Sequence, residues 1–189
     1  MSYQSRTRWM AVAGVCLSLL IGGCATNMAD QTNYGQRSED VEAIDSTVER
    51  EVGRALARAD ARLDDARIRP HSFNGKVLLV GQVPSQELKE RAEEVTGNLR
   101  GVNEVHNELT VAGNLSASQR LTDAWLTTNV ISQLATNDRI DSSKLKVTTE
   151  NASVYLMGIV SREEADRIVR TVSNVNGVQR IVKAFDYLD

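Results

Sequence analysis

The strongest constraint on the fold is an internal repeat, because the chain must build the same small structure twice. Residues 74–83 read NGKVLLVGQV and residues 151–160 read NASVYLMGIV, with aligned apolar positions. Residues 101–105 (GVNEV) and 177–181 (GVQRI) match in the same way. Upstream, three apolar positions of the first copy align with three of the second: Val48, Val52 and Leu56 with Leu126, Val130 and Leu134. Self-similarity of this length indicates two copies of one structural unit.

The first half of each copy is predicted to be a helix followed by a β-hairpin. A short strand near residues 66–69 leads to the Asn-Gly pair at 74–75, which signals a type I′ turn. The next strand, residues 76–83, is apolar on both faces, which indicates a central position in the sheet. Gly81 and Gly158 lie inside the equivalent strands and indicate a bulge or a close helix crossing. The helix is predicted from apolar residues at spacings of three or four: Ile44, Val48, Val52, Leu56, Ala59 and Leu63.

The second half of each copy is predicted to be a helix and a final strand. The helices begin near Ser85 and Ser161, and the second fits a capping box because a glutamate follows three residues later. Residues 105–111 alternate between apolar and polar side chains, as a half-buried strand does. The predicted fold class is α+β, with two tandem αββαβ domains, each a three-stranded mixed sheet with two helices on one face. These domains are expected over residues 44–113 and 117–189.

The N-terminal residues 1–23 have the three parts of a secretory signal. A polar segment with Arg6 and Arg8 precedes an apolar run over residues 9–21, and small residues follow it. As a helix this run would span roughly 20 Å, which is short of the ~30 Å hydrocarbon core of a bilayer. The ending Leu-Ile-Gly-Gly-Cys24 resembles the lipid-attachment signal of bacterial lipoproteins, so Cys24 is predicted to carry a lipid anchor. An ordinary secretory signal with an incidental cysteine is the alternative.

The segment after Cys24 is predicted to be a flexible tether. Residues 24–43 are polar and nearly free of aliphatic side chains, so they cannot bury enough surface to fold. Twenty flexible residues reach roughly 25 Å. By resemblance to Gram-negative sorting rules, Ala25 in place of aspartate favours the outer membrane. Because Cys16 leaves with the signal and Cys24 takes the lipid, we expect no disulfide and no cysteine nucleophile.

The residues of the repeat resemble a known family, the BON domain. The resemblance rests on the hairpin that enters a Val-x-Leu-x-Gly-x-Val strand at residues 77–83, the helix after it, and the Gly-Val pair before the last strand. Two such domains behind a lipid-attachment signal resemble the dual-BON outer-membrane lipoproteins. That resemblance implies a lipid-anchored protein that faces the periplasm, supports outer-membrane integrity, and contacts anionic phospholipid through its second domain.

Charge is distributed unevenly between the two copies. Residues 24–115 contain 11 basic and 16 acidic residues, whereas residues 116–189 contain nine of each. We therefore expect the first half to avoid anionic surfaces and the second half to approach them freely. Neither half has the basic character of a nucleic-acid-binding domain.

The sequence offers little material for catalysis or metal binding. His71 and His106 do not recur in the second copy, and both are interpreted as exposed surface histidines. Two histidines without cysteine make a zinc site improbable. The acidic cluster Glu87, Glu90, Glu93 and Glu94 falls on the solvated side of a helix. We expect no enzyme activity, no cofactor, no metal and no small-molecule substrate.

The first helix of the second copy differs from its counterpart on one side. Leu121 and Trp125 lie away from the core stripe on a helical wheel, where the first copy has Ala43 and Thr47. Packing of the tryptophan into the domain seam, or at the helix start, is one interpretation. Insertion into a bilayer interface is the other. The predicted phospholipid-binding residues are Leu121, Trp125, Thr128, Asn129 and Ser132.

The electrostatic part of lipid binding is expected to be weak. The resemblance implies basic residues on this helix, but Asn129 and Ile131 stand there instead. Each missing cation weakens the attraction to an anionic membrane by about 1 kcal/mol. Arg139, Lys144 and Lys146 follow the helix and offer partial compensation. Two hypotheses result: a phospholipid-binding module, or a protein-binding adaptor for an envelope assembly or cell-wall-remodelling machine. Exposure of Leu121 and Trp125 discriminates between them.

Overall fold

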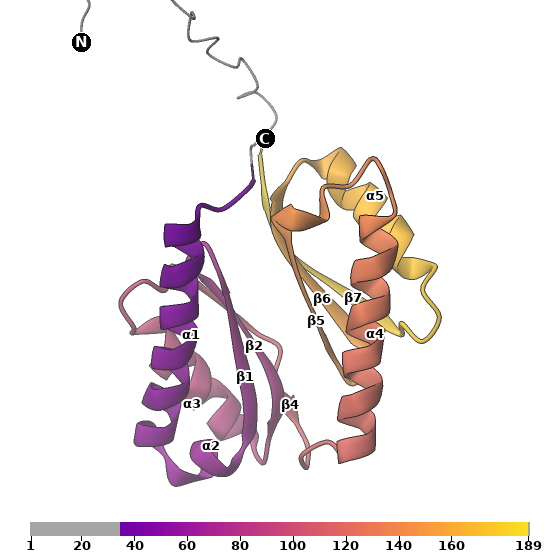
Figure 1. The fold of residues 1–189 in the computed structure, drawn as a ribbon. Coiled ribbons are helices and arrows are strands. Elements are labelled where there is room, and N and C mark those ends of the chain that lie inside the picture. The colour runs from indigo at the N-terminus through magenta and orange to yellow at the C-terminus, as the bar shows by residue number, and fades with distance from the viewer. Residues whose placement is uncertain (1–34, 189) are drawn as a thin grey trace, which may run out of the picture. The chain divides into compact units, whose positions relative to one another are not determined.

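The computed structural model describes residues 35–188, and these residues form two αββαβ modules in tandem (Figure 1). The expected signal peptide, Cys24 and most of the expected tether lie outside the described residues. The predicted α+β class with two helix-covered mixed sheets is confirmed. Within the described part of the chain, no helix is both long and apolar enough to cross a membrane.

The first module is built around β2, which is buried along its whole length. Strand β1 pairs with β2 antiparallel, and β3 and β4 pair with it in parallel. The Asn-Gly turn between β1 and β2 has positive φ at both residues, as the predicted type I′ turn requires. The elements are α1 (Glu39–Ala59), α2 (Ala61–Asp65), β1 (Arg67–Phe73), β2 (Lys76–Val83), α3 (Gln86–Gly97), β3 (Glu104–Asn107) and β4 (Thr110–Val111).

Three boundaries in this module differ from the sequence-based expectation. Helix α1 begins at Glu39, inside the expected tether, because Ser38 caps it and three acidic residues occupy its first turn. The predicted single helix stops at Asp60, whose extended backbone ends α1 and whose carboxylate caps α2. The last strand is divided into β3 and β4, because the Asn107 side chain accepts the backbone N–H of Leu109 where the strand would continue.

The second module repeats this plan with an uninterrupted final strand. Strand β6 is central, antiparallel to β5 and parallel to β7. The predicted capping box is confirmed: Ser161 accepts from the N–H of Glu164, and the Glu164 side chain returns to the N–H of Ser161. The elements are α4 (Ala117–Ala135), the 3₁₀ turn η1 (Ser142–Lys144), β5 (Leu145–Glu150), β6 (Ser153–Val160), α5 (Arg162–Ser173) and β7 (Arg180–Tyr187).

Glycines in the two central strands allow a close approach by the neighbouring strand. Gly81 has a φ of 125°, and a Cβ at this position would lie 1.9 Å from the carbonyl oxygen of Arg67 on β1. At Gly158 a Cβ would lie 3.0 Å from the carbonyl oxygen of Lys144. The approaching backbone belongs to β1 in the first module and to the end of η1, just before β5, in the second, so no α-helix crosses at either glycine.

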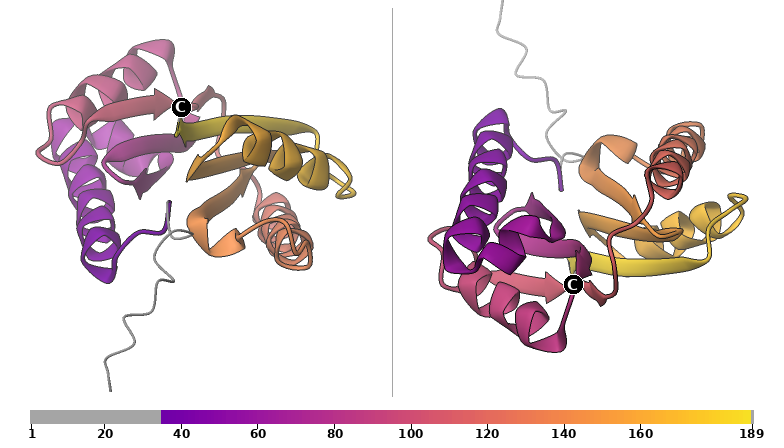
Figure 2. Two further views of the ribbon diagram at one scale, coloured as in Figure 1. Left: turned by 90° about the horizontal axis from the view of Figure 1, so that it is seen from above. Right: turned by 90° about the horizontal axis from the view of Figure 1, so that it is seen from below.

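Each module has its own core between its helices and one face of its sheet. Leu79 and Leu156 are fully buried at the centres of these two cores. The opposite faces of the two sheets pack against each other, so that the order is helices, sheet, sheet, helices (Figure 2). The buried side chains of this seam are Phe73, Leu78 and Val80 from the first module and Tyr155, Met157 and Ala184 from the second. This contact explains why β2 is apolar on both faces.

Candidate functional site

The outward face of α4 presents two large apolar side chains to solvent. Leu121 is 72% exposed and Trp125 is 61% exposed. The core stripe of the same helix, Leu126, Val130 and Leu134, is buried on the other side. The prediction that Leu121 and Trp125 lie off the core stripe is confirmed. The alternative in which Trp125 fills the domain seam is wrong, because the seam is formed by the sheets and α4 lies outside it.

The other predicted lipid-contact residues are distributed around this pair. Thr128 and Ser132 are exposed, and they follow Leu121 and Trp125 at helical spacings that place all four on one side. The Thr128 hydroxyl donates to the carbonyl of Ala124, 3.1 Å away, which satisfies its hydrogen and leaves its methyl group outward. Asn129 is only partly exposed and lies beside this stripe. We call Leu121, Trp125, Thr128 and Ser132 the α4 face.

The α4 face is unusually poor in charge for an exposed helix. Between Ala117 and Ala135 only Arg120 and Asp123 are charged, and Asp123 is buried. No acidic side chain is therefore exposed along the helix. A surface without carboxylates does not repel an anionic partner, and covering it buries no unpaired negative charge.

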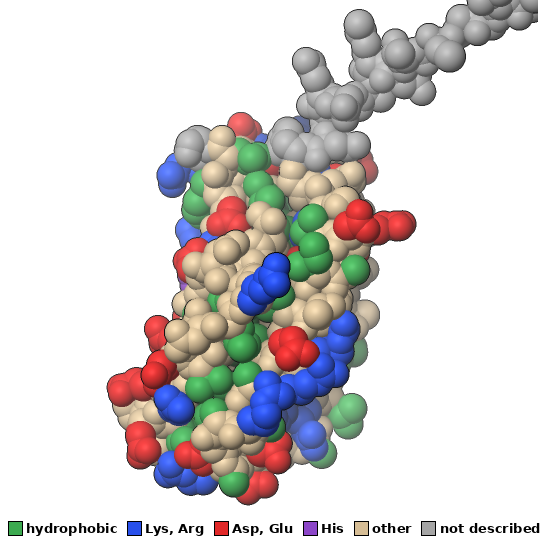
Figure 3. Space-filling model, turned by 90° about the vertical axis from the view of Figure 1, so that its left-hand side faces the viewer, with side chains coloured by type: hydrophobic (Ala, Val, Ile, Leu, Met, Phe, Trp, Pro, Cys, Tyr) green, Lys and Arg blue, Asp and Glu red, His purple; other side chains and the backbone are tan. Residues whose placement is uncertain are grey.

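Helix α1 presents a different surface at the equivalent positions. Ala43 and Thr47 replace Leu121 and Trp125, and the Thr47 hydroxyl accepts a hydrogen bond from Arg50 at 2.9 Å. The first turn carries Glu39, Asp40 and Glu42. Seen from the side on which α1 lies, acidic and basic side chains are scattered over the surface with apolar ones between them (Figure 3).

A buried aspartate ties each first helix to its hairpin, and the sequence analysis missed both. Asp45 accepts from the Ser72 hydroxyl at 2.7 Å, from the N–H of Asn74 at 2.9 Å and from Arg37 at 2.7 Å. Burial raises the pKa of Asp45, but these donors outweigh it and leave the pKa lowered. Asp123 accepts from the N–H groups of residues 151 and 152 at 2.8 and 3.0 Å. The recurrence of aspartate at equivalent positions of both copies was the available signal.

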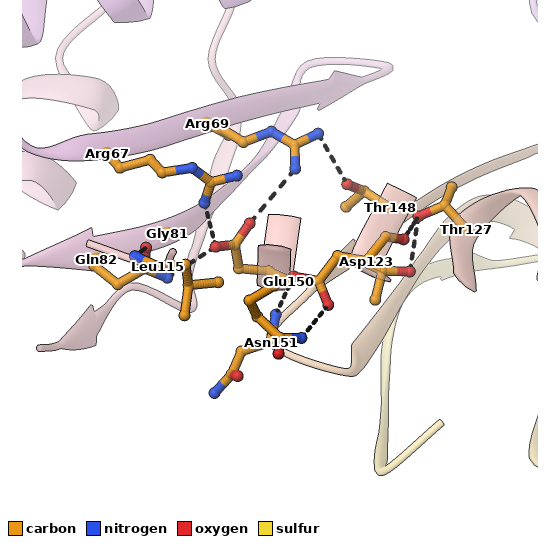
Figure 4. A network of polar contacts seen from close by, with 12 residues as sticks. Arg67, Arg69, Gly81, Gln82, Leu115, Asp123, Thr127, Thr148, Glu150 and Asn151 are labelled. Atoms are coloured by element: carbon orange, nitrogen blue, oxygen red, sulfur yellow. Dashed lines mark hydrogen bonds and ion pairs between the residues drawn. The ribbon is translucent and has the colours of Figure 1, made fainter. Parts of the chain in front are cut away.

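Ion pairs surround the apolar seam between the sheets. Glu150 is 4% exposed and accepts from three first-module side chains: Arg67, Arg69 (3.4 Å) and Gln82 (2.8 Å), as Figure 4 shows. Lys146 pairs with Glu49 and donates to the carbonyl of Ser72 at 3.0 Å. Such buried pairs cost desolvation, but their geometry fixes which surfaces of the two sheets meet. Two further cross-module pairs are Lys76 with Asp186 (2.7 Å) and Arg180 with Glu108 (2.9 Å).

The cations expected to compensate on α4 are mostly committed elsewhere. Lys144 is buried and lies 3.8 Å from Asp141, so its expected role near a membrane is wrong. Lys146 belongs to the seam. Arg139 is exposed beyond the C-terminal end of α4.

The two histidines are more buried than the sequence analysis expected. His71 lies on β1 against the second module, and burial, with Arg69 and Lys146 nearby, lowers its pKa to about 4. His106 is 32% exposed and pairs with Glu104 at 2.8 Å. Their interpretation as exposed surface residues is therefore wrong. Across residues 35–188, no group of three or more acidic, cysteine or histidine side chains is placed to hold a metal ion.

Comparison with known proteins identifies one family. The sequence profile of the BON domain matches residues 44–113 and 122–189. The chain is 37% identical over 175 residues to the "Outer membrane lipoprotein DolP" of Haemophilus influenzae, which covers 92% of this chain and 89% of that protein. It is 35% identical over 153 residues to the "21 kDa hemolysin" of Actinobacillus pleuropneumoniae, covering 80% and 78%. Among solved structures, the C-terminal domain of CdsD from Chlamydia trachomatis aligns with a TM-score of 0.30 at 14% identity, over 77% of this chain and 67% of that one.

Proposed function

This chain belongs to the BON-domain family, and from that premise we propose that it is a lipid-anchored outer-membrane protein whose second domain binds anionic phospholipid. The anchor is Cys24, and the two domains face the periplasm. The relative in Haemophilus influenzae is named an outer membrane lipoprotein, and it matches this chain along most of its length. The role of such binding is to support the integrity of the outer membrane.

The observation that carries the proposal is the exposure of Leu121 and Trp125 on α4. An indole ring is suited to the boundary between headgroups and acyl chains, because it combines a large apolar area with one N–H donor. Burial of such a side chain contributes about 2–3 kcal/mol. A helix with an apolar stripe and no exposed carboxylate is able to lie along a bilayer surface.

A lipid anchor makes this modest affinity sufficient. Several acyl chains on one cysteine hold a protein stably at a membrane, at ~0.8 kcal/mol per buried CH₂ group. The α4 face then meets the bilayer at a high effective concentration, so binding by the domain needs only a few kcal/mol of its own. The anchor is tested by Cys24→Ser, which we expect to leave the protein full length, unlipidated and soluble. Membrane fractionation with the mature size would contradict it.

A second candidate function rests on a groove in the first domain. Ile44 is 59% exposed and lines this groove with Ala43, Val48 and Gly101. An apolar groove of this kind fits a protein-binding adaptor for an envelope assembly or cell-wall-remodelling machine, with the lipid anchor only positioning it. The two functions place the binding surface on different domains.

Vesicle sedimentation of residues 33–189 tests the phospholipid proposal. This fragment is a compact unit without the residues of the expected signal and anchor. We expect it to sediment with phosphatidylglycerol-containing vesicles, and Trp125→Glu to abolish this while leaving the melting temperature nearly unchanged. Thr47→Glu, at the equivalent position of α1, is the matched control and should bind like the wild type.

Two outcomes would overturn the proposal. If Trp125→Glu binds vesicles as the wild type does, the α4 face is not the membrane surface. If it unfolds the domain, Trp125 contributes to packing and its exposure has no functional meaning. Leu121→Glu provides an independent check, because Leu121 is the more exposed of the two side chains.

A further inference from the structure

A polar cavity lies beside the α4 face, between the second domain and strand β1 of the first. Its volume is about 370 Å³, which falls within the ~300–1,000 Å³ typical of small-ligand sites. Strand β1 contributes Arg69 and His71, α4 contributes Arg120 and Thr127, and β5 contributes Lys146 and Thr148. The cavity wall therefore combines cationic side chains from both domains with threonine hydroxyls from the second.

The charges around this cavity do not cancel. Arg69 shares Glu150 with Arg67, and Lys146 is paired with Glu49. Arg120 makes no side-chain ion pair or hydrogen bond with any of residues 35–188. With the buried Asp123 on α4 counted beside Glu150 and Glu49, the four cations face three carboxylates, and the excess is one positive charge. None of the three carboxylates lines the cavity itself.

His71 is a second indication of positive potential at this place. Its Nε2 atom is buried and has no hydrogen-bond partner within the described part of the chain. Burial is the main cause of its lowered pKa, and Arg69 and Lys146 lower it further, whereas Glu49 acts in the opposite direction. The burial contribution would disfavour a bound anion as well as a proton, so only the contribution of Arg69 and Lys146 indicates positive potential at this place.

The cavity and the α4 face share one edge of the helix. Arg120 precedes Leu121, and Ala124, which also lines the cavity, precedes Trp125. Successive residues of a helix are rotated by about 100°, so these two pairs form adjacent stripes. An amphiphile whose apolar part contacts Leu121 and Trp125 would therefore have its polar part beside Arg120.

We propose that this cavity binds the phosphodiester of an anionic lipid headgroup through Arg120, Arg69 and the neighbouring threonine hydroxyls. The inference rests on the proposed phospholipid binding and adds the position of the headgroup. Guanidinium groups match the oxygens of a phosphate in geometry, and hydroxyl groups add neutral donors. Because Arg69 belongs to the first domain, the site is composite and exists only when the two sheets are packed together.

Charge-neutral substitutions in residues 33–189 test this site. We expect Arg120→Gln to weaken sedimentation with phosphatidylglycerol vesicles about fivefold or more, since one cation near an anionic surface is worth about that factor. Arg69→Gln should act in the same direction, although it lies on the other domain. Binding to pure phosphatidylcholine vesicles should change less in either variant, because the choline cation neutralises the phosphodiester of that headgroup. Arg58→Gln on α1 is the matched control, because Arg58 is exposed and does not line the cavity. This variant should bind the vesicles as the wild type does.

The possible results separate the two proposals. If Trp125→Glu abolishes vesicle binding while Arg120→Gln and Arg69→Gln bind phosphatidylglycerol normally, the proposed function holds and the headgroup site is wrong. If Trp125→Glu has no effect, the proposed function itself fails. Arg120 has no side-chain partner among residues 35–188, so Arg120→Gln should have a normal melting temperature. The Arg120 variant therefore still tests the site if Arg69→Gln destabilises the fold.

Free phosphate is the other source of the same chemistry. Titration of the wild-type fragment with inorganic phosphate or glycerol 3-phosphate, without vesicles, distinguishes the two. We expect no saturable binding below millimolar concentration, because the apolar contribution of the lipid is missing. Tight binding of free phosphate that Arg120→Gln removes, with vesicle binding unchanged in that variant, would overturn the headgroup assignment.

Discussion

Helices α1 and α4 occupy the same position in their modules but have different outer surfaces. Both bury an aliphatic stripe against the sheet, and both carry a buried aspartate that binds the hairpin. On the outside, α1 has acidic residues in its first turn, whereas α4 has none there and exposes Leu121 and Trp125. The positions that build the fold are therefore similar, and the positions that face solvent have diverged.

This difference shows how two copies of one fold acquire separate roles. The seam buries the outer faces of both sheets, which leaves the helices as the main exposed surfaces of each module. A change on a helix exterior does not disturb the core, because surface substitutions usually alter stability by less than about 0.5 kcal/mol. Substitutions in the cores should therefore have similar effects in the two modules, whereas substitutions on the helix exteriors should not.

The largest expected effect comes from a charge in either core. Leu79 and Leu156 are both fully buried, and Leu79→Asp or Leu156→Asp should destabilise its own domain by several kcal/mol, comparable with the whole stability of a small domain. Urea denaturation followed by circular dichroism measures this. Trp125 fluorescence reports on the second domain alone, because the other tryptophan, Trp9, precedes residue 33. Leu121→Asp is the control, and a similar loss there would contradict the assignment of the core.

A smaller effect is expected at the aspartates that bind the hairpins. Asp45→Asn should cost about 3 kcal/mol, because a carboxylate that accepts from Ser72, Asn74 and Arg37 is replaced by a neutral amide. Asp123→Asn should cost about 1–2 kcal/mol, since its hairpin contacts are two backbone N–H groups. Thermal unfolding of both variants decides the order, and equal losses would show that Arg37 and Ser72 contribute no more at Asp45 than Gln119, 3.1 Å away, does at Asp123.

The seam should become less stable in acid because of His71. Its pKa is about 4 in the folded protein, against ~6.5 in an unfolded chain. The unfolded state therefore binds a proton between these values and the folded state does not. The free energy of unfolding is therefore not reduced by His71 above pH 6.5, and it decreases as the pH falls toward 4.

The free energy of unfolding should fall by about 1–2 kcal/mol. This is less than the full shift in the pKa of His71 implies, because the ring is partly exposed. The comparison is between wild type and His71→Gln, measured by urea denaturation at pH 7 and pH 4.5. The difference in stability between the two proteins should shrink or reverse at the lower pH. A difference that is constant with pH would show that His71 titrates normally.

The smallest effect on stability is expected from transferring the α4 face to α1. Ala43→Leu with Thr47→Trp places the same pair on the first domain, and the melting temperature should change little. We expect this variant, combined with Trp125→Glu, to recover only weak binding to phosphatidylglycerol vesicles. The acidic first turn of α1 repels the lipid, and no cationic cavity adjoins the new pair. Full recovery would show that two exposed apolar residues suffice and that their surroundings do not matter.

The sequence by itself determined the features that depend on local periodicity. The helices, the capping box and the exposed side of α4 follow from spacings of three or four residues, which are set by helix geometry. The repeat follows from the similarity of residues 74–83 and 151–160, and the hairpin turn from the Asn-Gly pair. The position of Trp125 was predictable because it lies off the apolar stripe of its helix. A side chain there cannot pack into the core of its own domain. The buried aspartates were within reach of the same analysis, since they recur between the copies.

Only the tertiary structure decided what covers the outer faces of the sheets and what lies at their edge. The apolar residues on both sides of β2 indicated a central strand, but not that the second sheet would be its cover. Glu150 meets Arg67 and Gln82 across 83 and 68 residues of sequence, and His71 is partly buried against the other domain. Charged residues have no periodic signature, and their partners depend on how two finished domains pack. The cavity between Arg69 and Arg120 exists for that reason alone, since each arginine belongs to a different domain.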